Sequence, residues 1–386
     1  MNNFSIPVYS SWISDEDVEA VRGVAAEGWI SSTAPEVGKF ENDFAAYIGA
    51  DHAVSTSNGT TALHLVMTAL GIGPGDEVIV PDLTFIASAA TVAETGATPV
   101  FADVSPLDWN ITVEEVLRRR TPRTRAVLAV HLYGNPADCL AIAHGVPDLL
   151  LLEDAAEACG ASRKGRKTGT FGVAGCFSFY ANKVITTGEG GMIVTGDRKL
   201  ADRLRLLRGH AMAPDRKYYH PELGFNYRMT ALQAAIGRSQ LQRIETVLAL
   251  KKRVASWYEE RLADVPQIGL HPSGSRDVEG VYWMYSILLP DPATRERVME
   301  GLADDGIETR PFFLPMSTLP PFRKKSAEVR PVSLDLSQRG MNLPSWPLLS
   351  EEEVDRVCDS VRAALGIRSI RTVIDLNQPV PVEKAA

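Results

Sequence analysis

The sequence predicts an α/β protein with a mainly parallel sheet covered by helices on both faces. Between about residues 50 and 195, short strand-like runs alternate with helical patterns, which is typical of β-α-β units. The runs are continuously apolar, as expected for strands that are buried on both faces. Polar segments follow the strand ends, and in such sheets ligands bind beyond the carboxyl ends of the strands.

Seven strands are expected in this sheet. They cover residues 53–57, 77–81, 98–104, 126–134, 149–155, 176–180 and 191–196. An amphipathic helix over 13–27 precedes them, and helices near 61–70 and 86–95 follow the first two strands.

A helical stretch at about 230–263 leads into the remainder of the chain. This remainder has a strand, VYWMYSILL, then a helix, the segment GIETRPFF and a final helix, SEEEVDRVCDSVRAAL. At 386 residues the chain is long for a single core, so we predict two domains. A boundary near 245 divides it into a large domain, 1–245, a smaller α/β domain, 246–366, and an extended or disordered tail, 367–386.

The composition argues against several classes of protein. A net charge of −8 and a pI near 5.5 disfavour a nucleic-acid-binding surface. The apolar runs are far shorter than a membrane span, and the start of the chain lacks the pattern of a signal peptide. The four cysteines have no close pair and no accompanying histidines, so no metal site is predicted. We therefore expect a cytoplasmic protein that binds neither nucleic acid nor a membrane.

One lysine and one acid carry the strongest chemical signal. Lys183 lies between a strand-like run and a run of small, turn-forming residues, and Asp154 ends the buried run LLLLED. A lysine amine can condense with the aldehyde of pyridoxal phosphate, and a strand-end carboxylate can keep the pyridine nitrogen protonated. Partial burial and a cationic ring would lower the pKa of Lys183. Glu153 and Glu157 are the competing acids, whereas Lys164 and Lys167 fall in the polar turn SRKGRKTG.

The segment SNGTT predicts an anion site between a strand and a helix. Gly59 allows close approach of a ligand, Thr60 adds a hydroxyl donor, and the helix N-terminus offers unpaired N–H groups. The alternative is an ordinary N-cap by Ser57 or Asn58. Ser178 could donate a second hydroxyl to a phosphate. Phe85 could stack on a flat ring, although an aromatic at this position is more often part of a core.

Several ordered motifs resemble those of one enzyme family. They are NGTTALHL, PDLTFIASA, EDAAEACGA, FSFYANKVITTGEGGM and GFNYRMTALQAAIG. Together they are similar to the DegT/DnrJ/EryC1/StrS sugar aminotransferases, which are fold type I pyridoxal phosphate enzymes, and the resemblance runs from about residue 28 to 349. The run TTGEGG after Lys183 looks like the branch that aminates C4 of a nucleotide-linked sugar. Thr33-Ala34-Pro35 departs from a commonly glycine-containing loop, and Ala181 replaces a usual glycine.

The resemblance implies roles for the matching residues. Lys183 would hold the cofactor covalently and move the proton, Asp154 would pair with the ring nitrogen, and Phe85 would stack on the ring. Glu157 would lie near the ring hydroxyl. The phosphate would be held by Gly59, Thr60 and Ser178.

The same resemblance implies a homodimer with shared active sites. Asn226 and Arg228 would reach in from the neighbouring subunit. Arg310 would lie on the substrate side of the small domain. The residues near the nucleotide-sugar would be His210, Tyr218, Tyr219 and His220.

The expected reaction is a two-stage transfer of an amino group from glutamate to a nucleotide-linked 4-keto-6-deoxyhexose. An aminotransferase for a 3-keto-sugar or a cyclitol ketone is the nearest alternative. A non-catalytic sensor or binding protein on the same scaffold is a more distant one. A nicotinamide-dependent dehydrogenase would need a glycine-rich fingerprint after the first strand, and SNGTT is not one.

Overall fold

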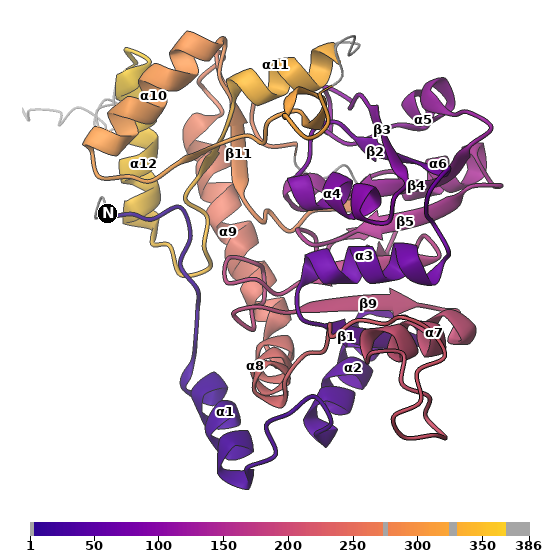
Figure 1. Ribbon diagram of the computed structural model, residues 1–386. Helices are drawn as coiled ribbons and strands as arrows, with labels where there is room; N and C mark the ends of the chain where they lie inside the picture. The colour runs from indigo at the N-terminus through magenta and orange to yellow at the C-terminus, as the bar shows by residue number, and fades with distance from the viewer. Residues whose placement is uncertain (1–3, 273–276, 324–329, 368–386) are drawn as a thin grey trace, which may run out of the picture.

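A seven-stranded sheet organises the first two thirds of the chain (Figure 1). The computed structural model describes residues 4–272, 277–323 and 330–367. The strand order is β1-β9-β8-β5-β4-β2-β3, and only β9 runs antiparallel to its neighbours. The strands are β1 (His52–Thr56), β2 (Glu77–Pro81), β3 (Thr98–Ala102), β4 (Thr124–Val130), β5 (Leu150–Asp154), β8 (Ala174–Ser178) and β9 (Gly191–Thr195). The predicted mainly parallel α/β sheet is confirmed.

Helices cover both faces of this sheet, which explains its continuously apolar strands. In β2, Val78 and Val80 belong to one core cluster and the intervening Ile79 belongs to another, because successive side chains point to opposite faces. The first face carries α3 (Gly59–Ala69), α4 (Ile86–Glu94) and α7 (Arg198–Arg208). The other carries α2 (Pro35–Ile48), α5 (Val113–Arg119), α6 (Cys139–Gly145) and α8 (Ala231–Gln242).

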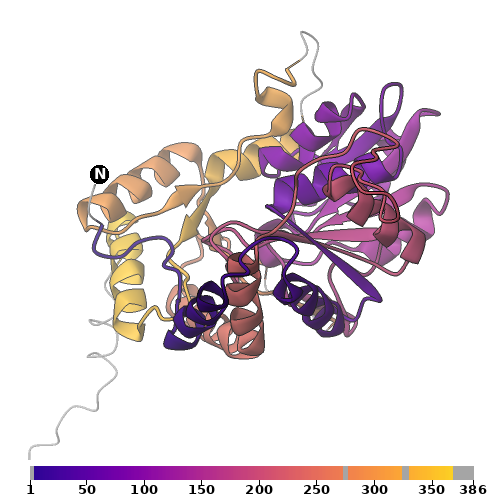
Figure 2. The same cartoon turned by 60° about the horizontal axis from the view of Figure 1, so that its bottom comes forward.

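The C-terminal part packs around its own apolar cluster beside the large sheet (Figure 2). An antiparallel sheet of order β11-β13-β12 lies there, and Ile6 from the start of the chain joins the same cluster. Its elements are α9 (Ile244–Leu262), β11 (Tyr285–Leu288), α10 (Pro292–Asp304), β12 (Arg310–Pro311), α11 (Pro331–Arg339), β13 (Gly340–Leu343) and α12 (Glu351–Ala364). The division at 245 stays a prediction, and the predicted tail lies outside the described residues except for Ile367.

Three short elements complete the sheets. A hairpin of β6 (Ser162–Arg163) and β7 (Arg166–Lys167) pairs with β10 (Val278–Glu279). Lys164 and Gly165 form its exposed tip, so the predicted polar turn is present within a small strand pair. The remaining elements are α1 (Asp15–Glu27), η1 (Leu132–Gly134) and η2 (Met316–Thr318). Among the described helices, none combines the length and apolarity needed to cross a membrane.

The predicted single helix over 230–263 is wrong, since the structure divides it into α8 and α9. The break lies at Arg243, whose backbone is non-helical with φ −113° and ψ 13°. The Arg243 guanidinium donates to the carbonyl of Trp12 at 3.0 Å and pairs with Asp17 of α1. Because these partners lie more than 200 residues away in sequence, local helix propensity gives no sign of the break.

The predicted strand over 126–134 is too long, because β4 ends at Val130 and a 3-10 turn follows. Within that turn, Tyr133 has φ 52°, which no strand allows. Gly134 has φ 90°, and a Cβ there would lie 2.8 Å from the backbone nitrogen of Trp283. The turn thus ends the strand early and lets the C-terminal part approach the end of the large sheet.

Candidate active site

A cavity of about 490 Å³ opens beyond the carboxyl ends of the parallel strands. Both parts of the chain contribute to its walls. The predicted site residues that line it are Gly59, Thr60, Phe85, Asp154, Glu157, Ser178, Lys183 and Arg310. Other lining residues include Asn58, Thr84, Tyr180, Asn182, Glu189, Trp283 and Phe313. The fold therefore brings together residues that span most of the chain.

Lys183 lies in the turn between β8 and β9. Its backbone N–H donates to the carbonyl of Tyr180 at 2.9 Å, and its Nζ lies 3.8 Å from the centre of the Trp283 ring. Desolvation lowers the pKa of Lys183, while Glu157 and Asp154 oppose that change. The pKa is lowered on balance, so the amine gives up its proton more readily than a solvated lysine does.

Asp154 ends β5 with its carboxylate directed into the cavity. Its Oδ2 accepts a hydrogen bond from Ser88 Oγ at 2.7 Å, and its Oδ1 accepts one from the Ala156 N–H at 3.1 Å. The Ser88 hydroxyl of α4 lies 3.1 Å from that of Thr84, which precedes the helix, so these two hydroxyls form a short chain that holds the acid. Asp154 is 6% exposed, and the nearby Lys183 amine favours its charge, as Asp154 favours that of Lys183.

Glu153, the competing acid, points to the opposite face of β5. Its two oxygens accept hydrogen bonds from the backbone N–H groups of Gly169, Phe171 and Gly172 at 2.6–2.7 Å. Its Oε2 also lies 3.1 Å from Nε2 of His131. Glu153 therefore anchors the loop that precedes β8 and takes no part in the cavity.

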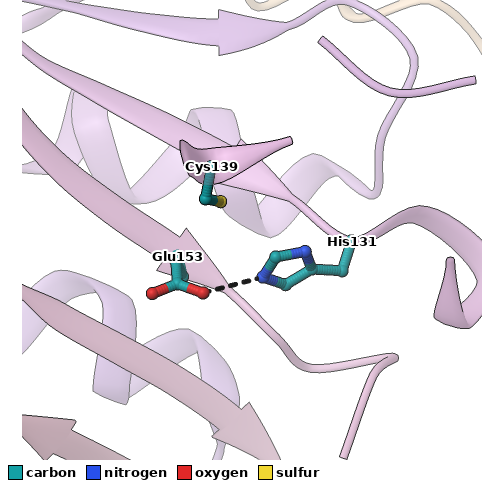
Figure 3. A group of neighbouring side chains, drawn as sticks. All are labelled: His131, Cys139 and Glu153. Atoms are coloured by element: carbon teal, nitrogen blue, oxygen red, sulfur yellow. Dashed lines mark hydrogen bonds and ion pairs between the residues drawn. The ribbon is translucent and has the colours of Figure 1, made fainter. Parts of the chain in front are cut away.

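His131, Cys139 and Glu153 lie close enough to suggest a metal site, but their bonding serves the fold (Figure 3). Nδ1 of His131 accepts the N–H of Ala137 at 3.0 Å, so Nε2 carries the proton and donates to Glu153. Burial raises the pKa of the Cys139 thiol well above its usual range. With both ring nitrogens engaged and a protonated thiol, the group lacks free ligand atoms for an ion.

Replacing Glu153 with Gln is expected to cost stability and leave catalysis in the folded protein near the wild-type rate. The amide N–H₂ group would face buried N–H donors, so the free energy of unfolding should fall by about 2–4 kcal/mol. Urea unfolding measures this, with Glu300→Gln on the exposed face of α10 as the control. An unchanged unfolding midpoint would contradict the anchoring role.

Glu157 lies inside the cavity beside Lys183. Its Oε2 accepts the backbone N–H of Tyr133 at 2.7 Å. Burial raises the pKa of Glu157 to about 7, and the nearby Lys183 and the N–H of Tyr133 act against this rise. The group therefore titrates close to neutral pH, so it can hold or release a proton where the predicted reaction occurs.

This raised pKa predicts how stability depends on pH. Between the ordinary value of 4.5 and about 7, folded Glu157 keeps a proton that the unfolded chain has released. The contribution of Glu157 to the free energy of unfolding should therefore fall as pH rises through this window, by on the order of 1–3 kcal/mol. Buried His271 and Lys251, whose pKa values burial lowers to about 3 and about 7, act in the opposite direction. Urea unfolding of the cofactor-free protein tests this. The difference in free energy of unfolding between wild type and Glu157→Gln isolates this contribution and should fall across the window, whereas the difference for exposed Glu260→Gln should not. A difference that stays constant for Glu157→Gln would contradict the raised pKa of Glu157.

The segment after β1 forms both the predicted N-cap and the predicted anion site, here called the Gly59 cradle. Asn58 Oδ1 accepts the N–H of Thr61 at 2.8 Å, which caps α3, so the first-turn N–H groups of Gly59 and Thr60 face the cavity without helix partners. A Cβ on Gly59 would lie 2.8 Å from Cβ of Ser178. Only glycine lets the two sides of the cradle come this close, and Ser178 lines the same cavity.

Phe85 is 53% exposed at the start of α4, so it is not a core residue. Its ring centre lies 5.7 Å from that of Phe313, and both line the cavity. Arg310 also lines the cavity; its guanidinium lies 5.2 Å from the centre of the Tyr9 ring and 3.8 Å from Glu308. The cavity thus offers an aromatic wall and a guanidinium on the side of the C-terminal part.

Six predicted residues do not line the cavity of their own chain. They are His210, Tyr218, Tyr219, His220, Asn226 and Arg228. They lie together between α7 and α8, where a β-bridge joins Gly209 to Asn226. Arg228 Nε donates to Asn226 Oδ1 at 3.0 Å, and Nδ1 of His220 lies 2.8 Å from the carbonyl of His210. Tyr218 lies in the same exposed segment.

The sequence provided no prediction for two side chains that hold Asp154 and Lys183. Ser88 holds Asp154. Its position in a helix, four residues after Thr84, is the only feature of the local sequence that could have indicated this role. Trp283 touches Lys183, yet in the sequence it is one of several aromatic residues in a strand-like run.

Comparison with known proteins agrees with this geometry. The DegT/DnrJ/EryC1/StrS aminotransferase family matches residues 12–362. The chain belongs to this family. GDP-perosamine synthase of Caulobacter vibrioides is 46% identical over 333 residues, which are 85% of this chain and 90% of that protein. GDP-perosamine synthase of Escherichia coli O157:H7 is 43% identical and covers 92% of this chain and 97% of its own length.

The comparison with solved structures agrees with the family match. The crystal structure of S. venezuelae DesV in complex with a ketimine intermediate superposes with a TM-score of 0.85 at 37% identity. It covers 90% of this chain and 94% of the DesV chain. The predicted family, fold type and aminotransferase class of this chain are therefore confirmed.

Proposed function

We propose that this aminotransferase uses pyridoxal phosphate to move an amino group from glutamate to C4 of a GDP-linked 4-keto-6-deoxyhexose, as a GDP-perosamine synthase does. The observation that carries the proposal is the meeting of Lys183, Asp154 and the Gly59 cradle in one cavity. The relatives at 43–46% identity support the substrate class. A cytoplasmic location stays a prediction.

The residues of the cavity fit the cofactor in shape and charge. The cradle at Gly59 and Thr60 suits a phosphate, since a helix N-terminus favours an anion and the missing Cβ leaves room beside Ser178. Buried Asp154 has a hydroxyl and an N–H as hydrogen-bond partners, and a pyridinium would place a positive charge directly against its carboxylate. Phe85 offers an exposed ring face for stacking.

When bound, pyridoxal phosphate supplies a reactive aldehyde and an electron-withdrawing ring. Lys183 would bind the aldehyde through Nζ and, once displaced, would take a proton from the carbon of the amino donor and return one to the acceptor. Its lowered pKa makes the neutral amine available for both tasks. Asp154 would keep the ring nitrogen charged, and the Ser88 hydroxyl would hold Asp154 in place. Glu157 would hold or release a proton near the ring hydroxyl.

The substrate side is also part of the proposal. Arg310 would bind an anionic group at the mouth of the cavity. Asn226 and Arg228 would enter the cavity of a partner chain in a homodimer with shared active sites. His210, Tyr219 and His220 would contact the nucleotide-sugar from the same segment.

A substrate panel tests the proposal. Purified protein with pyridoxal phosphate and glutamate should release 2-oxoglutarate with a GDP-linked 4-keto-6-deoxyhexose, and mass spectrometry should find the amino-sugar nucleotide. A 3-keto-sugar nucleotide and a cyclitol ketone serve as comparison substrates. Turnover with one of those and none with the 4-keto-sugar would replace the proposed substrate by the alternative.

A further inference from the structure

Trp283 contacts the lysine segment at two points. Its Nε1 donates to the backbone carbonyl of Asn182 at 2.8 Å, and the Lys183 Nζ lies 3.8 Å from the centre of its ring. One contact fixes the backbone just before the lysine, and the other fixes the amine itself. An ammonium over an indole face is attracted by the ring electrons, and the attraction is stronger where water is excluded.

Trp283 itself has little freedom to move. It is 7% exposed, and its ring stacks beside that of Tyr133 with centres 6.3 Å apart and planes 13° apart. Gly134 approaches its backbone so closely that a Cβ there would lie 2.8 Å from the Trp283 nitrogen. The carbonyl of Gly134 also accepts the N–H of Val281 at 3.0 Å. The indole is therefore a fixed surface against which Lys183 rests.

A second lysine, which is buried, donates a hydrogen bond to the backbone of Trp283. Lys251 of α9 is 5% exposed, and its Nζ donates to the carbonyls of Ser345 at 2.6 Å and Trp283 at 3.4 Å. Lys251, Trp283 and Lys183 all border a small cavity of about 30 Å³ on the far side of the lysine turn. Burial lowers the pKa of Lys251 to about 7, so keeping a lysine at this position is costly.

We propose that the ring face of Trp283 is the resting position of the free Lys183 amine, here called the Trp283 seat. Lys251 is a positioning residue that acts on Lys183 through Trp283. The use of this seat rests on the proposed function, in which the amine leaves the cofactor and returns to it in each half-reaction. A fixed resting place keeps the free amine within reach of the carbon that it must deprotonate. The arrangement itself is a property of the chain without cofactor.

The seat has a measurable consequence for the protonation of Lys183. The charged groups that face Nζ are Glu157 and Asp154, and both favour the ammonium, as does the indole face. Burial is the main cause of the lowered pKa of Lys183, and a leucine in place of Trp283 keeps an apolar side chain against Nζ, so the site stays dry. Loss of the indole face should then lower the apparent pKa of Lys183, by roughly 0.5 to 1.5 pH units.

Competitive amine labelling of the cofactor-free protein measures this directly. The rate at which Lys183 is acylated is followed across pH by mass spectrometry of its peptide, and the midpoint is compared among variants, because the midpoint does not depend on access of the reagent. Trp283→Leu should lower the midpoint, and Trp283→Phe, which keeps a ring but loses the N–H, should lower it less. Trp257→Leu, which removes a ring that contacts Arg253 on α9, should leave it unchanged.

The role of Lys251 is tested by a double-mutant cycle. Lys251→Met keeps the length of the side chain, so it is expected to fold, and it should lower the Lys183 midpoint in the wild-type background. The change should be absent in the Trp283→Leu background, because the two residues act in series. The exposed neighbour Lys252→Met is the control.

Each outcome decides the proposal. A direct electrostatic effect of Lys251 would have the opposite sign, because removing a nearby positive charge raises the pKa of Lys183. A raised midpoint, or an equal change in both backgrounds, would overturn the positioning role of Lys251. An unchanged Lys183 labelling midpoint in both Trp283 variants would overturn the proposal that the Trp283 ring holds the amine. Since labelling needs neither cofactor nor substrate, these results are independent of whether the proposed sugar is turned over.

Discussion

Lys183→Ala protein is expected to transaminate at least about 10⁴-fold more slowly than wild type, because one side chain both bonds the cofactor and moves the proton. Borohydride reduction of the wild-type holoenzyme should attach the cofactor to the peptide that contains residue 183, and the variant should carry none there. The yellow absorbance of the wild-type enzyme should be lost on reduction. Release of 2-oxoglutarate measures the rate.

Lys164→Ala is the matched control for this experiment. Lys164 lies at the exposed tip of the hairpin between β6 and β7, where it touches no part of the cavity. It should keep the wild-type rate. A Lys183→Ala protein with undiminished turnover would remove the covalent and proton-transfer roles together, since among the residues that the structure describes the cavity lining includes no second lysine.

Asp154→Asn is expected to lower kcat by roughly 10²–10³-fold while the protein stays folded. The amide has the shape of the acid, and its oxygen can still accept the N–H of Ala156. Its N–H₂ group can donate to the Ser88 hydroxyl, which can turn toward Thr84. What is lost is the negative charge that keeps the ring nitrogen protonated, so the loss should appear in kcat while the unfolding midpoint changes little.

Two controls separate this charge effect from a structural one. Asp148→Asn lies just before the other end of β5, with an exposed carboxylate paired to Arg120, and it should keep full activity. Glu153→Gln changes the neighbouring acid and should lower stability instead of kcat. If Asp154→Asn were as active as wild type, the ring-pairing role of Asp154 would have to be abandoned.

Local patterns in the sequence predicted the strands of the large sheet well. The run EVIVP over 77–81 coincides with β2, and each of the other six strands overlaps its prediction. Continuous apolar runs carry this information because a parallel strand must be apolar on both faces. The acid at the end of such a run and the lysine in a turn of small residues stand out for the same reason, since each interrupts a strongly patterned segment.

Features that depend on distant contacts were not predictable in this way. The break at Arg243 comes from its contacts with Trp12 and Asp17, which the helical pattern on either side does not record. The roles of Glu153 and Asp154 could not be divided by sequence alone. Alternation places them on opposite faces of β5, but only the loop at 169–172 shows which face leads to the cavity.

The sequence by itself determined the sheet and the family, and it singled out Lys183 and the acids at the end of β5, because these follow from patterns that are read along short segments. The tertiary structure alone decided what holds them: Ser88 against the acid, Trp283 against the amine and Lys251 behind Trp283. The physical reason is that such supporting contacts join side chains from separate elements, and their geometry exists only once both parts of the chain have packed.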